Sequence, residues 1–244
     1  MKKVILSFAA FIAAISLSAQ NDMKPESTEW YYPQPAKVIP AKNPSQAPSD
    51  AIILFDGKDL SKWAASDGNE SKWKLADGAM TATEGAGDIY TRDYFGDCQL
   101  HIEFRSPFPV KSGGQGRGNS GVFLQSIYEV QVLDGDDNPT YVNGMVGSIY
   151  KQQAPLFDAY TKSGEWQVYD IFWKAPVFGT EGKLESPAMI TVLLNGVLIQ
   201  NNYVLKGNTP WIGFPEYHAH GRLPLMLQNH GDPVSYRNIW IRNL

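Results

Sequence analysis

The segment CQLHIEFR, residues 98–105, alternates apolar and polar side chains without a break. A period of two residues is typical of a β-strand with one face in the core, because successive side chains of a strand point to opposite sides. The same period recurs at residues 128–132 and 237–242, and Asn195-Gly196 between two apolar runs indicates a tight β-hairpin. No stretch of the domain shows the period of an amphipathic helix. We therefore predict an all-β protein, a two-sheet antiparallel jelly-roll sandwich.

The first nineteen residues have the pattern of a secretory signal peptide. Lys2 and Lys3 precede an apolar stretch over residues 4–15, and small or polar residues follow as far as Ala19. The apolar stretch is too short to cross a bilayer, so we expect no transmembrane segment and cleavage after Ala19. The protein is accordingly predicted to be periplasmic or secreted.

Composition divides the rest of the chain into a tether and a domain. Residues 20–50 are rich in proline and polar residues and lack an apolar period, which predicts a mobile, extended tether. Residues 51–244 show strand patterning throughout and are predicted to form a single β-sandwich domain. Cys98 is the only cysteine, so it forms no disulfide within the chain.

The charge of the chain excludes one class of partner. The formal net charge is −4, and it becomes −6 when Lys2 and Lys3 leave with the signal peptide. Nucleic-acid binding requires a basic surface, so we expect no nucleic-acid partner. Aromatic residues make up 12% of the chain, a content that suits core packing and stacking on sugar rings equally well.

Strand alternation also predicts which polar side chains share a face. In the segment quoted above the apolar residues fill the core, which leaves Glu103 and Arg105 on the opposite side. The same reasoning puts Glu129 and Gln131 outside the core. We expect these four side chains to line one groove.

Residues near the C-terminus are expected to join that groove. Gln228 and His230 alternate with core leucines, and histidine exchanges protons near neutral pH, so His230 is a candidate general acid or base. Asp134 falls inward in an ideal strand, but a bulge near Leu133, or the turn that starts at Asp134, would turn it back beside Glu129 and Gln131.

Three further residues are candidates for ion pairing or metal binding. Arg237 is two and four residues before Ile239 and Ile241, so alternation places it on the same buried face of the strand. A buried arginine needs a carboxylate partner, which would be either Asp134 or Glu103. His218 and His220 have the spacing of a two-histidine metal clip, although the sequence shows no third ligand. A divalent metal ion is thus an open alternative, and no other cofactor is expected.

Eight short motifs follow one another along the domain. They are LFDGKDLSKW (54–63), EFR (103–105), NSG (119–121), YEVQVLD (128–134), GEW (164–166), LNG (194–196), LQNHG (227–231) and YRNI (236–239). In this order and at these separations they resemble the 3-keto-disaccharide hydrolase domain family, formerly a domain of unknown function. The resemblance spans residues 51–244 and implies a concanavalin A-like lectin/glucanase fold with its site on the concave face of one sheet. The chain departs from the family pattern at Asn229, at Tyr236 and in the long insert 207–222.

The resemblance implies a carbohydrate-active enzyme that cleaves the glycosidic bonds of 3-keto-glycosides or disaccharides. A ketone at C3 makes the C2 proton acidic, so cleavage would proceed by abstraction of that proton, elimination and hydration. We assign catalysis to His230, Glu129 and Asp134, with His230 or Glu129 as the base and Asp134 as the acid at the leaving oxygen.

The expected partner is an oligosaccharide or glycoside. Lys151, Arg105 or a metal ion is expected at the ketone oxygen, and Tyr128 or Trp211 would stack on the sugar. The complete set assigned to substrate binding is Glu103, Arg105, Asn119, Tyr128, Gln131, Lys151, Gln228, Trp211 and Arg237.

Two other functions fit the same residues. The spacing from Glu129 through Gln131 to Asp134 is similar to the bulged strand of jelly-roll retaining glucanases, in which two carboxylates act as nucleophile and acid/base. The groove and its aromatic residues also suit a non-catalytic carbohydrate-binding module. The sequence leaves open the linkage, the aglycone, the oligomeric state and the choice between elimination and direct hydrolysis.

Overall fold

A computed structural model describes residues 23–43 and 45–244, and the predicted signal peptide lies outside these residues. The chain divides into two units, residues 1–38 and 39–244. In the first unit a single 3-10 turn, η1 (Pro25–Thr28), is followed by extended chain, and the described side chains are almost all exposed. Within the described part of the chain no helix is long and apolar enough to span a membrane.

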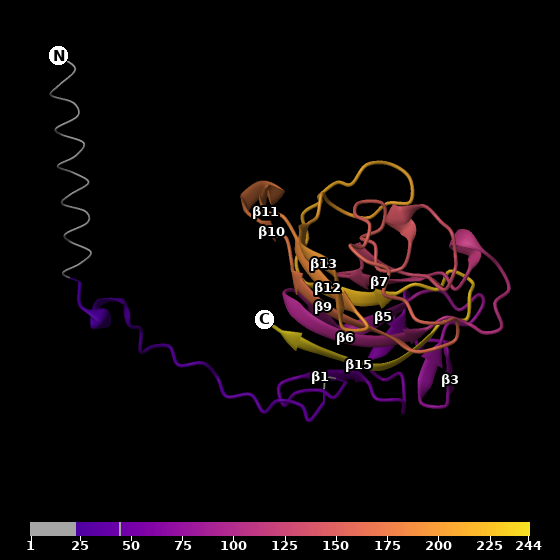
Figure 1. Ribbon diagram of the computed structural model, residues 1–244, viewed down its shortest axis with the longest axis horizontal. Coiled ribbons are helices and arrows are strands. Elements are labelled where there is room, and N and C mark those ends of the chain that lie inside the picture. The colour runs from indigo at the N-terminus through magenta and orange to yellow at the C-terminus, as the bar shows by residue number, and fades with distance from the viewer. Residues whose placement is uncertain (1–22, 44) are drawn as a thin grey trace, which may run out of the picture. The chain divides into compact units, whose positions relative to one another are not determined.

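The second unit contains two large antiparallel sheets (Figure 1). The larger sheet has eight strands among the described residues. Seven follow the order β13 (Val197–Val204), β12 (Met189–Leu194), β9 (Gln167–Lys174), β6 (Cys98–Arg105), β15 (Ser235–Asn243), β4 (Ala79–Thr81) and β3 (Lys74–Ala76). The eighth, β1 (Ile52–Phe55), pairs with β15.

The smaller sheet has five strands, again counting described residues only. Their order is β2 (Trp63–Ala65), β5 (Ile89–Phe95), β14 (Leu223–Leu227), β7 (Ser120–Leu124) and β8 (Tyr128–Val132). A separate hairpin pairs β10 (Val177–Phe178) with β11 (Leu184–Ser186), and 3-10 turns lie in the connections at η2 (Gly114–Gly116), η3 (Val142–Gly144) and η4 (Thr180–Gly182).

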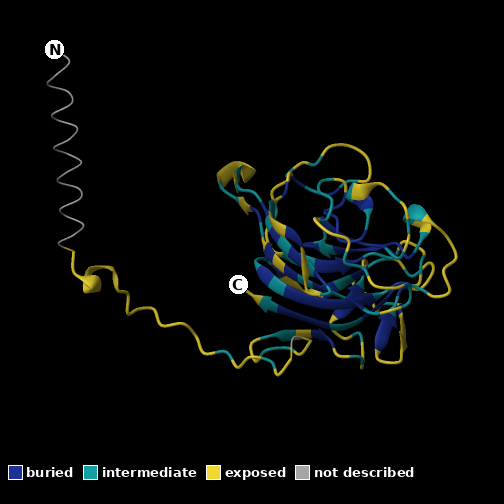
Figure 2. Cartoon of the chain, in the orientation of Figure 1, coloured by how far each residue is buried: buried dark blue, intermediate teal, exposed yellow. Residues whose placement is uncertain are grey.

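The core lies between the two large sheets. Alternate residues of the central strands fill it, so that Leu100 and Ile102 of β6 and Val130 and Val132 of β8 are fully buried. Figure 2 shows the strands as largely buried and the connecting loops as exposed. Burial of apolar side chains such as these is the main favourable term in folding, about 1.5–3 kcal/mol for each large side chain.

The predicted fold class and the predicted hairpin are both confirmed. The chain forms a two-sheet antiparallel jelly-roll sandwich, and the described residues contain no α-helix. Asn195 and Gly196 join β12 to β13 with φ angles of 53° and 80°. Two successive left-handed residues make the turn whose twist matches that of a hairpin, which is why asparagine followed by glycine indicated it.

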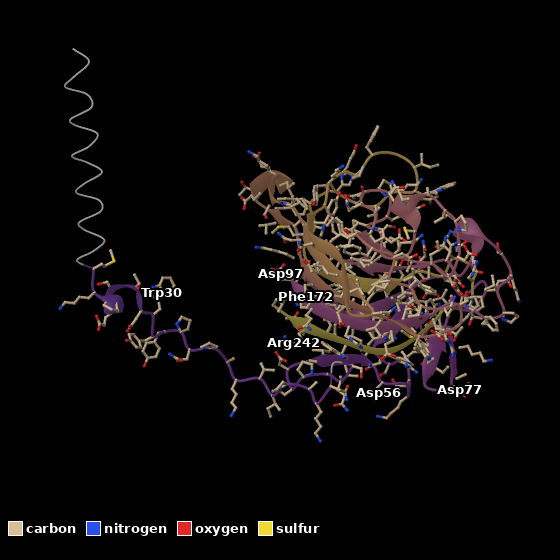
Figure 3. All side chains as sticks on the ribbon, viewed as in Figure 1. Trp30, Asp56, Asp77, Asp97, Phe172 and Arg242 are labelled. Carbon is tan, nitrogen blue, oxygen red and sulfur yellow. The ribbon has the colours of Figure 1, made fainter. Side chains whose placement is uncertain are left out.

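The segment that precedes β1 is hydrogen-bonded to the larger sheet. Arg242 of β15, labelled in Figure 3, donates to the carboxylate of Asp50 at 2.7–3.0 Å. The side-chain amide of Asn238 donates to the carbonyl oxygen of Ser45 at 2.7 Å. These contacts attach the residues just before the sandwich, while the mobility of residues 20–50 as a whole stays a prediction.

Candidate functional site

A cavity of about 570 Å³ opens on the side of the five-stranded sheet that faces away from the core. Its lining comes from β7, β8, the residues after β14 and three connecting segments: Gln115, Asn119, Phe123, Glu129, Gln131, Tyr141, Tyr150, Thr209, Trp211, Gln228 and His230. Because Val122 and Val130 on the same strands are buried in the core, their neighbours Phe123 and Glu129 must face the cavity.

The pairing of β7 with β8 positions the acidic side chain of the cavity. Phe123 lies opposite Glu129, and Gly121 lies opposite Gln131, in a register without any shift. A Cβ atom built on Gly121 would lie 2.5 Å from Oε1 of Glu129. Glycine at this position therefore leaves the space that the Glu129 carboxyl group occupies.

A loop rather than a strand covers the outer edge of β8. Gln131 donates its backbone N–H to Ser148 and accepts one from Gly147, both at 3.0 Å, and Tyr150 donates to the carbonyl of Glu129 at 3.3 Å. These backbone groups of Glu129 and Gln131 are thereby satisfied by residues 147–150, of which Tyr150 also lines the cavity.

Burial without a counter-charge sets the protonation of Glu129. The residue is only 5% exposed, and its carboxyl group forms no ion pair with any described residue. Burial alone raises the pKa of Glu129 to about 8, because the charged form loses its hydration. The group therefore holds its proton near neutral pH but releases it at small cost, which suits a proton-transfer group.

Residues from the end of β14 complete the polar side of the cavity. Gln228 donates its backbone N–H to the carbonyl of Gly121 at 3.0 Å, which fixes this segment beside β7. His230 is exposed at the opening and lines the same cavity as Glu129. The predicted grouping of Glu129, Gln131, Gln228 and His230 is thus present in the structure.

Aromatic side chains form another part of the lining, and one lysine lies against them. The hydroxyl groups of Tyr141 and Tyr150 are 2.8 Å apart. The ammonium group of Lys151 lies 5.9 and 5.7 Å from the centres of these two rings and donates to the carbonyl of Trp211. Lys151 is thus adjacent to three lining residues, and Trp211, 72% exposed, presents its indole at the opening.

The expected single groove is wrong for Glu103, Arg105 and Arg237. Their strands, β6 and β15, belong to the eight-stranded sheet, so these side chains lie away from the cavity. Arg237 pairs with Glu103, one of its two predicted partners, with its Nε atom 2.5 Å from Oε2, and both arginines pack against the ring of Trp166. The register of β15 shifts between Arg237 and Trp240, where Asn238 has a φ of 46°. Because of this shift, Arg237 does not face the core with the isoleucines that follow it, as simple alternation had predicted.

The predicted proximity of Asp134 to Glu129 is also absent. Asp134 lies two residues beyond the end of β8 at Val132, is 1% exposed and does not line the cavity. Its carboxylate accepts hydrogen bonds from the hydroxyl groups of Ser106 and Ser163 at 3.1 and 3.0 Å and lies 3.3 Å from Arg117. Asp134 therefore anchors loops and does not reach the cavity.

Tyr128, expected to stack on a sugar, is a core residue. Its ring packs against Trp173, with centroids 5.0 Å apart, and its hydroxyl group is 2.8 Å from Nε2 of His220. His218 is exposed beside Glu216, 3.8 Å away. Within residues 23–43 and 45–244 no three histidine, cysteine or acidic side chains cluster as they would around a metal ion.

Sequence reasoning placed Asn119 correctly at the cavity but missed several of its neighbours. Asn119 donates through Nδ2 to the carbonyl of Gln115 at 2.8 Å. The missed lining residues are Gln115, Phe123, Tyr141, Tyr150 and Thr209. Phe123 was within reach of the alternation rule, because it is two residues beyond Gly121 on the same face. The other four lie on loops, where period-two patterning carries no information.

The fold and this site together define a concanavalin-like β-sandwich with an aromatic-walled cavity that contains one acidic side chain among its described lining residues. The chain belongs to the family of the 3-keto-alpha-glucoside-1,2-lyase-like domain, which it matches over residues 50–242.

Solved structures agree with this assignment. The chain is 49% identical to a protein of Parabacteroides distasonis ATCC 8503 described as a candidate glycosyl hydrolase; the match covers 91% of this chain and 97% of that one, with a TM-score of 0.86. A second candidate glycosyl hydrolase from the same organism is 21% identical over 80% of this chain and 94% of its own, with a TM-score of 0.60, and shows the fold alone. No curated protein matches the chain.

Proposed function

We propose that this protein cleaves the glycosidic bond of 3-keto-glycosides by elimination across C1 and C2. The family and its 49%-identical neighbour support a carbohydrate-active enzyme. The observation that carries the proposal is the buried carboxyl group of Glu129, which has no counter-charge and shares its cavity with the imidazole of His230.

The reaction requires one base, one acid and one stabilising charge. A base removes the C2 proton, and the electrons of that bond form an enolate whose negative charge rests on the C3 oxygen. When the enolate collapses, the C3 carbonyl returns, a double bond forms between C1 and C2, and the bond from C1 to the aglycone oxygen breaks. The aglycone oxygen takes a proton and leaves as an alcohol, and water then adds to the unsaturated sugar.

The cavity has a suitable group for each role. His230 is the base for the C2 proton, since its ring is exposed at the opening. Glu129, with a pKa of about 8, still carries its proton near neutral pH and donates it to the leaving oxygen. The Lys151 ammonium contacts the lining residues Tyr141, Tyr150 and Trp211, and we assign to it the stabilisation of the enolate oxygen.

An ordinary retaining glycosidase is less well supported by this geometry. Retaining enzymes need two carboxyl groups on either side of the scissile bond. Among the described lining residues only Glu129 is acidic, and Asp134, the second carboxylate of that alternative, is held by Ser106 and Ser163 outside the cavity.

The test uses methyl 3-keto-α-glucoside deuterated at C2, with the unoxidised glucoside as control. The proposal predicts cleavage of the keto sugar alone, with loss of the deuterium to solvent. His230→Ala should lower the rate by about 10²–10⁴-fold, whereas His218→Ala, an exposed histidine outside the cavity, should leave it unchanged. Cleavage of the unoxidised glucoside with the label retained would support a glycosidase, and binding without cleavage would support a binding module.

We also propose that the protein is exported. The basic residues, the short apolar stretch and Ala19 at the start of the sequence support a cleaved signal peptide. Expression of the full gene followed by N-terminal sequencing should find Gln20 as the first residue in the periplasmic or extracellular fraction. Recovery of Met1 in the cytoplasm would contradict the proposal.

A further inference from the structure

The side-chain amide of Gln131 is held in one orientation by its neighbours. Gln115 donates through Nε2 to Thr140 and to the carbonyl of Gly144, at 2.9 and 2.8 Å, so its Oε1 atom is left as an acceptor. Gln131 donates through Nε2 to that oxygen at 3.1 Å and to the Gly144 carbonyl at 3.2 Å. Rotating the Gln131 amide by half a turn would place its oxygen against two other acceptors, so the orientation is determined by the hydrogen bonds.

This arrangement leaves the Gln131 oxygen without a partner. Gln131 is 1% exposed and lines the cavity, and its Oε1 atom accepts no hydrogen bond from any described residue. Buried polar atoms are nearly always paired, because an unpaired one loses its hydration without compensation. An unpaired acceptor on a side chain that lines a cavity is therefore a group that a donor on a bound molecule would satisfy.

We infer that Gln131 recognises one hydroxyl group of the reacting sugar ring, an inference that rests on the proposed function. Both amide hydrogens of Gln131 are in use, so only a group that donates a hydrogen bond satisfies Oε1. Hydroxyl groups donate, whereas a ketone or ether oxygen only accepts. Gln131 thereby selects glycosides in which a particular hydroxyl is free, neither oxidised, removed nor substituted.

The spacing along β8 assigns this hydroxyl to the ring that reacts. Glu129 and Gln131 are two residues apart on one face of the strand, a separation of about 7 Å. That distance is comparable with the span of one pyranose ring and its substituents. A sugar whose leaving oxygen meets Glu129 therefore presents a hydroxyl of the same ring to Gln131, and the aglycone lies elsewhere.

The test compares methyl 3-keto-α-glucoside with its 2-deoxy, 4-deoxy and 6-deoxy derivatives. With the wild-type protein, kcat/KM should fall by about 10–100-fold for one derivative and much less for the other two. In Gln131→Met, which keeps the length of the side chain but accepts no hydrogen bond, the parent sugar should lose a similar factor. The specific penalty for that one derivative should then disappear, as a direct interaction requires.

Gln200→Met is the matched control. Gln200 is also 1% exposed and donates twice through Nε2, to Gly147 and Ala154, but it does not line the cavity. It should lose stability yet retain the full penalty for the sensitive derivative. The thermal midpoint of each variant shows whether a loss of activity comes from misfolding. The comparison of the three deoxy sugars with the wild-type protein does not depend on any variant.

A binding measurement separates this inference from the proposed function. Dissociation constants are measured by calorimetry for the same sugars in Glu129→Gln and in Glu129→Gln with Gln131→Met. Suppose that the wild-type protein cleaves no keto sugar, that one deoxy derivative binds more weakly than the parent sugar, and that this difference disappears in Gln131→Met. The proposed function then fails and the inference stands. Equal behaviour of all three derivatives, a penalty that persists in Gln131→Met, or no binding of any sugar would overturn the inference.

Discussion

Glu103 and Glu129 are two buried carboxyl groups, one on each sheet, and they differ in almost everything except exposure. Glu103 is 6% exposed and Glu129 5%. Burial alone would raise the pKa of Glu103, but nearby His101 and hydrogen bonds from Asn238 and Arg237 outweigh it and lower the pKa to about 2. Burial of Glu129 has no such opposition, and its pKa rises to about 8. Burial makes charge costly for both groups, and the presence or absence of donors decides whether the charge remains.

The charged groups around Glu103 pair with one another and lie outside the cavity. His101 lies 2.7 Å from Asp170 and 3.8 Å from Glu103. Burial would lower the pKa of His101, but these two carboxylates raise it to about 9, so the histidine is a buried cation near neutral pH. Charges on the eight-stranded sheet thus neutralise one another, whereas the carboxyl group in the cavity has no counter-charge among the described residues.

Replacing each glutamate by glutamine should separate the two roles most clearly. Glu129→Gln removes the transferable proton and should lower kcat/KM on a 3-keto-glucoside by about 10²–10⁴-fold. Glu103→Gln should leave kcat/KM per folded molecule unchanged, because Glu103 does not line the cavity. Steady-state kinetics corrected for the folded fraction measures both, and an equal loss in the two variants would refute the division.

Stability should respond in the opposite way. Glu103→Gln removes the carboxylate that neutralises Arg237 and helps neutralise His101, and should lower the free energy of unfolding by about 2–3 kcal/mol. Glu129→Gln replaces a carboxyl group that has no counter-charge, so at pH 8 it should be at least as stable as the wild-type protein. Urea denaturation at pH 8 gives both values, and a larger loss in Glu129→Gln would contradict the comparison.

The two sites should also differ in their dependence on pH. Between about pH 4.5 and 8 the folded state keeps a proton on Glu129 that the unfolded chain has released, so unfolding becomes easier as the pH rises. Between pH 5.5 and 7 this amounts to about 2 kcal/mol, and it should be absent from Glu129→Gln.

His101 also makes the free energy of unfolding fall as the pH rises, but over a higher pH range. It is present below about pH 6.5 and is lost as the pH rises through about 9. His101 is present in both the wild-type protein and Glu129→Gln, so its contribution cancels when their free energies of unfolding are subtracted. A flat difference across pH 5.5–7 would mean that Glu129 is ionised in the folded protein.

A smaller effect is expected from filling the space beside Glu129. A Cβ on Gly121 would lie 2.5 Å from both Oε1 of Glu129 and an edge carbon of Phe123. Gly121→Ala should therefore displace the carboxyl group and reduce kcat/KM about tenfold. Gly113→Ala is the control, because a Cβ there meets no atom within 4 Å. Full activity of Gly121→Ala would show that the position of Glu129 is not critical.

Much of the fold and part of the site followed from strand alternation. The rule states on which side of its own strand a residue lies, and it grouped Glu129 with Gln131 correctly. It does not state which of two sheets a strand joins, because that depends on long-range pairing, and for this reason Glu103 and Arg105 were grouped with the wrong partners.

Bulges were the second limit of prediction from sequence. A bulge or turn at residues 133–134 was expected to bring Asp134 beside Glu129, which the structure does not show, and no bulge was expected at Asn238, where β15 shifts its register. Asn238 reaches its φ of 46° while its side chain donates to Glu103 at 2.8 Å and to Ser45, contacts far away in the sequence. Local patterning contains no trace of such partners, so Arg237 was assigned to the wrong face.

The loop that covers the edge of β8 has a consequence for how the family diversifies. Residues 147–150 satisfy the backbone of the strand that carries Glu129 and Gln131, and they do so without being a strand themselves. A loop tolerates insertions and substitutions that a ladder of paired strands does not. Proteins of the family are therefore expected to differ in this loop, and with it in the cavity wall around Tyr150, while Glu129 and Gln131 stay in place.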